Sequence, residues 1–347
     1  SNKVIIGGRK SKLAVIQSEL IKGSILHHFP NLDIQIIALS TLGDKIQNKP
    51  LYSFGGKSLW TKELEILLLT NLVDNSINLD LPRIDLIVHS LKDMPTFLPP
   101  HFELACISER EDPSDAVVMP SYSPYKSLSD LPSNSIVGTS SIRRSAQLLK
   151  NFPYLKFQSC RGNVLTRLNK LDDPSSEFDC LILATAGLKR LDLSHRITYT
   201  LNSKNGMYHA VGQGALGIEI KKNNFYIKKI LNKILNLDAT ACCLAERSLM
   251  RTLEGGCSVP IGVESEFNNN ILLLKAIVIS VDGKKFVEDQ YSLDFSPLIS
   301  NTNNNKDNIQ KISYNDQFVQ YAESVGRILA NNLIDKGAKE ILNEINL

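Results

Sequence analysis

The chain has 347 residues, more than one ordinary hydrophobic core needs, so its length predicts two or three domains. Hydrophobic residues make up 43% and charged residues 22% of the chain, which is typical of a soluble globular protein and not of a disordered or membrane-spanning one. The 39 basic and 36 acidic residues nearly balance, and no run of lysines and arginines is long enough for a nucleic-acid-binding surface. Any anion must therefore be bound by a local site.

The first 108 residues alternate between short apolar runs and amphipathic segments. Such alternation predicts an α/β domain with a mostly parallel sheet and helices on its faces. The expected strands are 4–6, 34–39, 85–89 and 104–107, and the expected helices are 10–29 and 61–72.

A second block repeats this alternation up to about residue 205. Its expected strands are 116–119, 136–137, 157–160 and 180–184, and its expected helices are 141–150 and 163–171. A second crossing between the domains is expected near 202–206, after which the chain partly returns to the first domain. We therefore expect domain 1 to comprise 1–108 and 207–225, and domain 2 to comprise 109–206.

From about Asp238 the pattern changes, and we expect a smaller α+β domain over 226–347. The expected elements are a helix at 239–253, strands at 259–263, 271–279 and 285–291, and a closing helix at about 316–345. The polar, asparagine-rich stretch 301–307 is expected to be a surface insert without a part in the chemistry.

The six cysteines are not spaced like zinc ligands or like a disulfide framework. None forms a CxxC pair, and Cys242 and Cys243 are adjacent. We therefore expect free thiols in a reducing compartment and no bound metal. No signal-peptide core follows Ser1, and no apolar run approaches the length of a membrane span, so we expect a cytoplasmic protein.

Cations follow almost every predicted strand of the first two domains, where ligands of α/β sheets bind. Cations are disfavoured near the positive N-terminus of a helix, so their repeated occurrence there indicates an anion between them. Arginine pairs bidentately with carboxylates, and a converging set suits a ligand with several carboxylates. The alternative is that these side chains only solvate helix starts. The arginines in question are Arg9, Arg143, Arg144, Arg161, Arg167 and Arg190.

Asp93 is the lone acid within these cationic clusters. Opposite charges should keep it ionised, and it could stabilise a developing cation or transfer a proton to a leaving amine. The alternative is a helix cap or a salt bridge to the adjacent Lys92.

Cys257 follows Gly255 and Gly256 at a turn between a predicted helix and a predicted strand. Glycines before a thiol let it reach toward a ligand, and a thiolate attacks electron-poor carbon well. The other cysteines lie in apolar contexts, where a free cysteine acts as a small hydrophobic residue. An inert cysteine is the alternative for Cys257 as well.

Nine motifs together resemble those of the hydroxymethylbilane synthase (porphobilinogen deaminase) family. They occur in order over residues 3 to about 265, and VHSLKD and EGGCSVP are the most specific. The motifs are GGRKSKLAVIQ (7–17), GGKSLWTKELE (55–65), DLIVHSLKDMPT (85–96), EREDPSDA (109–116), GTSSIRRSAQL (138–148), RGNVLTRLNKLD (161–172), ATAGLKRL (184–191), GQGALGIE (212–219) and LEGGCSVPIG (253–262).

The resemblance implies a monomeric transferase of tetrapyrrole (heme) biosynthesis. It implies two α/β domains that resemble periplasmic binding proteins, and a third domain that carries a dipyrromethane cofactor through a thioether to Cys257, one per chain. Four porphobilinogens would be joined head to tail on this cofactor, and water would release the linear tetrapyrrole. Asp93 would assist the loss of ammonia and stabilise azafulvene and pyrrolenine cations.

The resemblance also implies contacts to the acetate and propionate groups of cofactor, substrate and growing chain. Besides the six arginines, the matching residues are Ser11, Ser90, Lys92, Thr139, Ser140, Ser141 and Ser159. The stretch 44–57, which ends at Lys57, resembles the family's mobile lid, with Trp60 at the place of an aromatic residue. Gly8 departs from the family, which usually has a hydroxyl residue there.

Two other functions fit the residues. A binding protein that closes on a carboxylate-rich ligand would explain the arginines and leave Cys257 structural. A thiol acyltransferase or hydrolase would pair Cys257 with His89 or His209, although neither histidine lies in a motif suited to a base.

Overall fold

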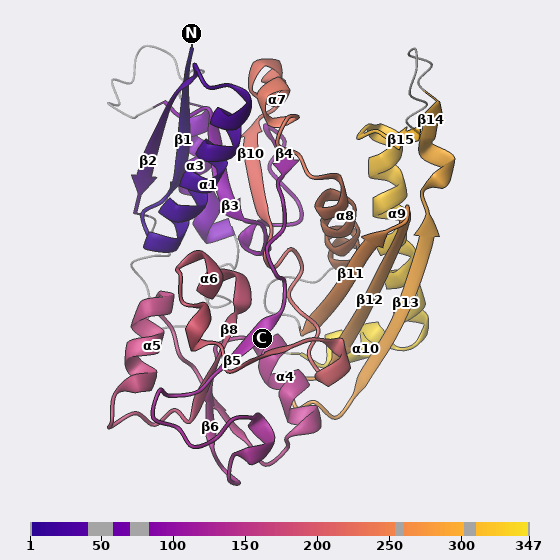
Figure 1. Cartoon of the computed structure of the whole chain (residues 1–347). Coiled ribbons are helices and arrows are strands. Elements are labelled where there is room, and N and C mark those ends of the chain that lie inside the picture. The colour runs from indigo at the N-terminus through magenta and orange to yellow at the C-terminus, as the bar shows by residue number, and fades with distance from the viewer. Residues whose placement is uncertain (1, 41–57, 70–82, 254–259, 302–309, 346–347) are drawn as a thin grey trace.

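The computed structural model describes residues 2–40, 58–69, 83–253, 260–301 and 310–345. Within this part of the chain, two five-stranded sheets lie one beyond the other, and a third, three-stranded sheet with its helices lies beside them (Figure 1). The α/β class with a smaller third unit, expected from the sequence, is confirmed.

The first sheet has the strand order β2-β1-β3-β10-β4. Its strands are β1 (Lys3–Arg9), β2 (Asp33–Leu39), β3 (Leu86–Ser90), β4 (Phe102–Ile107) and β10 (Leu216–Lys221). The strands β1, β2 and β3 are parallel, whereas β10 runs antiparallel to both of its neighbours. The expected strands did not include β10, because its antiparallel place depends on pairing with β3 and β4, which lie far away in the sequence.

Helices cover both faces of the first sheet because its strand residues alternate between the faces. Val4 and Ile6 pack with helices α1 (Lys12–His28) and α7 (Phe225–Leu231), whereas Ile5 packs with α3 (Ser58–Leu68) on the other face. The helix expected at 61–72 begins at Ser58 in the structure.

The second sheet has the strand order β7-β6-β8-β5-β9, and β5 runs antiparallel to both β8 and β9. Its strands are β5 (Asp115–Val118), β6 (Ile136–Gly138), β7 (Lys156–Gln158), β8 (Cys180–Ala184) and β9 (Tyr199–Leu201). Leu148 of α4 (Ile142–Asn151) packs on one face of this sheet. Helices α5 (Val164–Asp172) and α6 (Thr185–Arg190) pack on the other face through Leu168 and Leu188.

The chain crosses between the two sheets twice, and the two crossing segments are hydrogen bonded to each other. The Arg110 side chain donates from Nε to the carbonyl oxygen of Gln213 at 2.9 Å, and Gln213 donates from Nε2 to the carbonyl oxygen of Pro113 at 2.8 Å. The Glu111 amide donates to the Gly214 carbonyl at 3.1 Å. The two sheets are therefore joined by a double connection.

The third unit packs helices against one antiparallel sheet. Its sheet is a meander of β11 (Ile261–Asn268), β12 (Ile271–Ile279) and β13 (Phe286–Asp294), and a short hairpin is formed by β14 (Ile299–Asn301) and β15 (Gln310–Ile312). Its helices are α8 (Leu237–Thr252), α9 (Asp316–Asp335) and α10 (Ala338–Asn343). The single closing helix expected from the sequence is broken, because Gly337 adopts a left-handed conformation with φ of 103° between α9 and α10.

The helix α8 approaches α9 closely, because α9 carries a glycine at the contact. A Cβ atom on Gly326 would lie 2.2 Å from the Ala245 carbonyl oxygen.

No helix of the described residues is long and apolar enough to cross a membrane. The five described cysteines are free and buried.

Candidate functional site

Asp93 lies in a 3-10 turn, Leu91–Asp93, that follows β3 directly. Leu91 and Met94 are buried, and the Leu91 amide donates to the Ala215 carbonyl at 2.9 Å. These two apolar side chains, three residues apart, hold the turn against the core. Lys92 and Asp93 are consequently left at its partly exposed side.

Three arginines of the second sheet's unit lie near Lys92 of this turn or near one another. The pKa of Lys92 is lowered to about 8. Burial is the largest cause, the charge of Asp93 opposes it, and Arg144 and Arg167 act in the same direction as burial. Burial lowers the pKa of Arg167 to about 10, and the charges of Arg144 and Arg161 act in the same direction. Lys92 of the first sheet's unit and these arginines of the second therefore lie near one another; their part in ligand binding stays a prediction.

Two of these guanidinium groups carry buried N–H groups without a hydrogen-bond partner among the described residues. They are Nη1 of Arg161 and Nε of Arg167. Buried polar groups are normally paired, so an unpaired cationic donor indicates a missing anionic acceptor. Carboxylates of a ligand fit this position, since they would supply acceptors and balance the charge. The residues present therefore fit a cofactor that bears several carboxylates.

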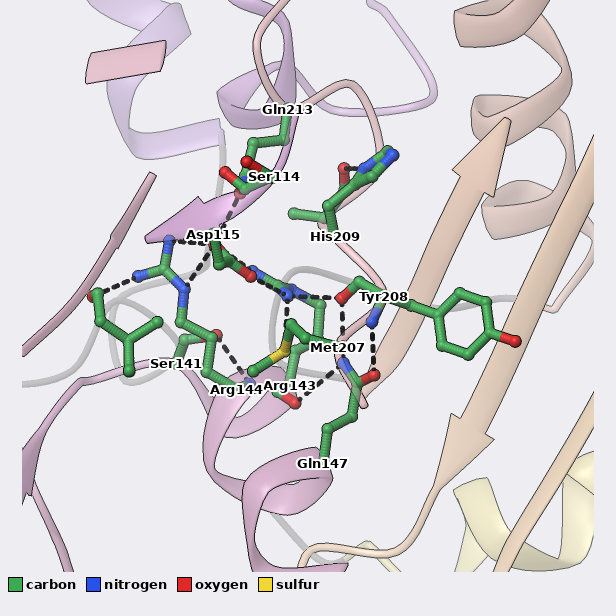
Figure 2. A network of polar contacts seen from close by, with 12 residues as sticks. Ser114, Asp115, Ser141, Arg143, Arg144, Gln147, Met207, Tyr208, His209 and Gln213 are labelled. Carbon is green, nitrogen blue, oxygen red and sulfur yellow. Dashed lines mark hydrogen bonds and ion pairs between the residues drawn. The ribbon is translucent and has the colours of Figure 1, made fainter. Parts of the chain in front are cut away.

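Arg143 and Arg144 converge on one buried carboxylate, that of Asp115 at the start of β5 (Figure 2). The Nη1 atom of Arg143 lies 2.8 Å from Asp115 Oδ2, and the Nε atom of Arg144 lies 3.0 Å from Asp115 Oδ1. Against the effect of burial, these two arginines hold the pKa of Asp115 well below its ordinary value. Asp115 thus neutralises part of the cationic cluster from inside the protein.

The same network reaches the second crossing segment. Gln213 donates from Nε2 to Asp115 Oδ1 at 2.9 Å, and Arg143 donates to the Tyr208 carbonyl at 2.7 Å (Figure 2). Arg190 donates to the Gly214 carbonyl at 2.8 Å. The arginines of the second sheet are therefore fixed to the segment that joins the sheets. Sequence reasoning missed Asp115 and Gln213, although both lie within the EREDPSDA and GQGALGIE motifs.

The predicted hydroxyl residues hold local structure around the cluster. Ser11 and Ser141 cap α1 and α4, each accepting a hydrogen bond from a backbone amide of the first turn at 3.3 Å. Ser140 and Ser159 are hydrogen bonded to each other at 2.8 Å. Their part in ligand binding stays a prediction.

Three further predicted residues lie at strand ends. Arg9 ends β1, Ser90 ends β3 and donates to Gln17 Oε1 at 3.1 Å, and Thr139 follows β6 and accepts from the Ser141 amide at 3.1 Å. Gly8, the glycine that departs from the family pattern, is closely packed, because a Cβ atom there would lie 2.9 Å from Ser18 Oγ.

Part of the prediction falls outside the described residues. Cys257, Lys57 and the proposed lid over 44–57 lie there, as does the insert 301–307 apart from its first residue. The backbone of Trp60 belongs to α3, but its side chain is not described. Their roles stay predictions.

The two histidines that a thiol enzyme would need are buried in polar contacts. His89 Nε2 lies 2.7 Å from Glu219 Oε2, and His209 Nδ1 lies 2.8 Å from the Ala210 carbonyl oxygen. Burial lowers the pKa of His209, although the charge of Glu246 opposes this. The His89 contact joins β3 to β10, whereas the His209 contact is to the next residue in the chain. No group of three or more histidine, cysteine or acidic residues placed to hold a metal occurs among the described residues.

Two family models match the chain. "Porphobilinogen deaminase, dipyromethane cofactor binding domain" matches residues 4–229, and "Porphobilinogen deaminase, C-terminal domain" matches residues 240–296. Porphobilinogen deaminase of Candida albicans is 58% identical over 349 residues, covering 100% of this chain and 94% of that protein. That of Debaryomyces hansenii is 57% identical, covering 99% and 88%, and that of Saccharomyces cerevisiae is 56% identical, covering 99% and 97%.

Proposed function

The chain belongs to the porphobilinogen deaminase family, and we propose that its converging cations hold the carboxylates of cofactor and substrate while Asp93 carries the charge of the reaction. The activity is that of a transferase of tetrapyrrole biosynthesis, which deaminates four porphobilinogens, joins them head to tail on a covalent dipyrromethane and releases the linear tetrapyrrole by hydrolysis. The residue roles are supported above all by the unpaired donors of Arg161 and Arg167.

The dipyrromethane cofactor, when bound through the proposed thioether to Cys257, supplies the pyrrole carbon that forms the new bond with each substrate. Arg161, Arg167 and Lys92 are assigned to its carboxylates, since their charges lie close together and are poorly compensated. Holding the acid groups in fixed positions orients the reacting carbon, which is the main contribution a protein can make to such a coupling.

Asp93 is assigned to the positive charge that develops when ammonia leaves porphobilinogen. The buried Leu91 and Met94 hold the turn against the core, and Asp93, next to Lys92, is only half-buried there. A carboxylate in this place can also accept the proton that the coupled ring gives up.

The remaining cations are assigned to the growing chain, since every added unit brings an acetate and a propionate. Arg9 and Arg190 stand at the ends of elements that border the cluster. Arg143 and Arg144 are assigned to the same task, in exchange with Asp115, which binds them in this structure. In this exchange the two arginines can bind ligand carboxylates, and Asp115 balances their charge when no ligand is bound.

We further propose the division into domains 1–108 with 207–225, 109–206 and 226–347, which the strands that each sheet recruits support. The start of the proposed third domain forms most of α7, whose Ile227 and Ile230 pack on the first sheet. A monomeric cytoplasmic enzyme without a membrane or nucleic-acid partner is proposed with it, supported by the nearly balanced charge and the free, buried cysteines. Size-exclusion chromatography with light scattering checks the monomer.

Intact mass and turnover test the residue roles together. We expect purified protein to be heavier than its sequence by one dipyrromethane, and Cys257→Ser to lack this mass. Asp93→Asn should retain the cofactor and the fold while turnover of porphobilinogen is nearly abolished. Asp335→Asn, which changes an exposed acid at the end of α9, is the matched control and should keep full activity. Full activity with an unmodified Cys257, or in Asp93→Asn, contradicts the proposal.

A further inference from the structure

We infer that Arg247 of α8 is a positioning residue, which holds the segment after Asp93 in place and fixes it relative to the helix that leads toward Cys257. This inference rests on the proposed roles of Asp93 and Cys257. It concerns a contact between the first sheet and the third unit.

The contact consists of hydrogen bonds from a side chain to the backbone. Arg247 donates from Nη2 to the Pro95 carbonyl oxygen at 2.8 Å and from Nη1 to the Met94 carbonyl oxygen at 3.4 Å. One turn later on α8, Arg251 donates to the Thr96 carbonyl oxygen at 3.0 Å. Three successive carbonyl groups that begin immediately after Asp93 are thus bound by a single helix.

The charge of Arg247 is committed to this contact. The residue is only 3% exposed, and within the described part of the chain it forms no salt bridge. The pKa of Arg247 is lowered to about 10, mainly by burial and also by the charge of Arg251, whereas the charge of Glu219 opposes the shift. The guanidinium therefore stays ionised at neutral pH. A buried ionised donor binds carbonyl oxygens more strongly than a neutral one, and its loss leaves those oxygens without a partner.

The segment is held from both sides. Before Asp93, the Leu91 amide is bound to the Ala215 carbonyl, and after it the Met94 and Pro95 carbonyls are bound to Arg247. The helix α8 ends at Thr252, five residues before the proposed attachment cysteine. Arg247 therefore connects the segment that follows the proposed acid to the helix that precedes the proposed anchor in the sequence. A displacement of about 1 Å in such an arrangement can cost about a hundredfold in rate.

The first experiment compares Arg247→Gln, Arg247→Lys and the control Arg327→Gln in the complete cofactor-bearing enzyme. Arg327 is an exposed arginine on the neighbouring α9, so its replacement should leave activity unchanged. For Arg247→Gln we expect retained cofactor by intact mass, an unchanged KM for porphobilinogen, and a kcat lower by about 10- to 100-fold. Arg247→Lys keeps a charged donor and should recover part of the loss. An unchanged kcat in Arg247→Gln overturns the inference.

The second experiment asks whether Arg247 acts through Asp93. Asp93→Glu displaces the carboxylate and is combined with each Arg247 variant in a double-mutant cycle. We expect the Arg247 effect to shrink strongly in the Asp93→Glu background, and a full, multiplicative loss overturns the inference. If Arg247→Gln does not fold, the cycle with Arg247→Lys decides by the same criterion. Full activity in Asp93→Asn would instead refute the proposed function, whatever the Arg247 variants do.

Discussion

Glu65 of α3 provides a direct test of the electrostatics inside the first sheet. Its side chain is 4% exposed and lies against Glu219 of β10, which is fully buried. Burial, together with the charge of Glu219 and a hydrogen bond to it, raises the pKa of Glu65 from 4.5 to about 7, whereas Thr61 and Lys62 oppose the shift. His89 contacts Glu219 from β3, and Arg247 faces it from α8. We therefore expect Glu65 to be protonated below about pH 7.

The effect on stability follows from linkage. Between pH 4.5 and about 7 the folded protein binds this proton and the unfolded chain does not, so the free energy of unfolding falls as the pH rises through this window. At 1.36 kcal/mol per pH unit the loss is about 3 kcal/mol at most, and solvent screening reduces the expected value to about 1–3 kcal/mol. Glu65→Gln keeps a hydrogen-bonding side chain that cannot titrate, and should remove this part of the pH dependence.

Urea unfolding at pH 5 and pH 8, followed by far-ultraviolet circular dichroism, measures the difference. The wild-type protein should lose about 1–3 kcal/mol more than Glu65→Gln between these pH values. Glu19→Gln, which replaces an exposed acid on α1 of the same unit, should behave like the wild type. Equal losses in the wild type and in Glu65→Gln would show that Glu65 is already ionised at pH 5, and the argument from its burial beside Glu219 would be wrong.

Two further predictions concern packing and buried charge. Asp115→Asn leaves the buried guanidinium groups of Arg143 and Arg144 without their carboxylate, and should lower the free energy of unfolding by about 3–5 kcal/mol in urea; a loss below about 1 kcal/mol contradicts this account. Gly326→Ala brings a methyl group against the Ala245 carbonyl oxygen and should cost about 1–3 kcal/mol, seen as a lower Tm, whereas an unchanged Tm would mean that α8 and α9 separate freely.

The sequence predicted those elements in which side-chain pattern alone determines the structure. The apolar runs of β3 and β8, and the helix α8, occur close to the expected positions. The strand β10 was not expected, because its place between β3 and β4 depends on pairing with segments more than a hundred residues away. Strand pairing of this kind leaves no local trace in the chain.

The sequence indicated which cations the candidate site would contain, but not which carboxylate would balance their charge. The motifs indicated that Lys92, Arg144 and Arg167 converge, and their mutual effects on pKa agree with that. No pattern indicated that Asp115 would bind two of the arginines. Arg143 and Arg144 follow Asp115 by 28 and 29 positions, so these salt bridges depend on the folded geometry. The sequence thus shows which cations the motifs contain, whereas their partners depend on the fold.

The place of β10 in the first sheet has a consequence for folding during synthesis. All five strands of the second sheet lie within residues 115–201, so that sheet can close as soon as this stretch has left the ribosome. The first sheet begins earlier but waits for residues 216–221, and until then β3 and β4 each present an open edge on the nascent chain. The first sheet is thus completed after the second sheet, although its synthesis begins first. We expect chaperones to act on the unpaired edges of β3 and β4 during this interval.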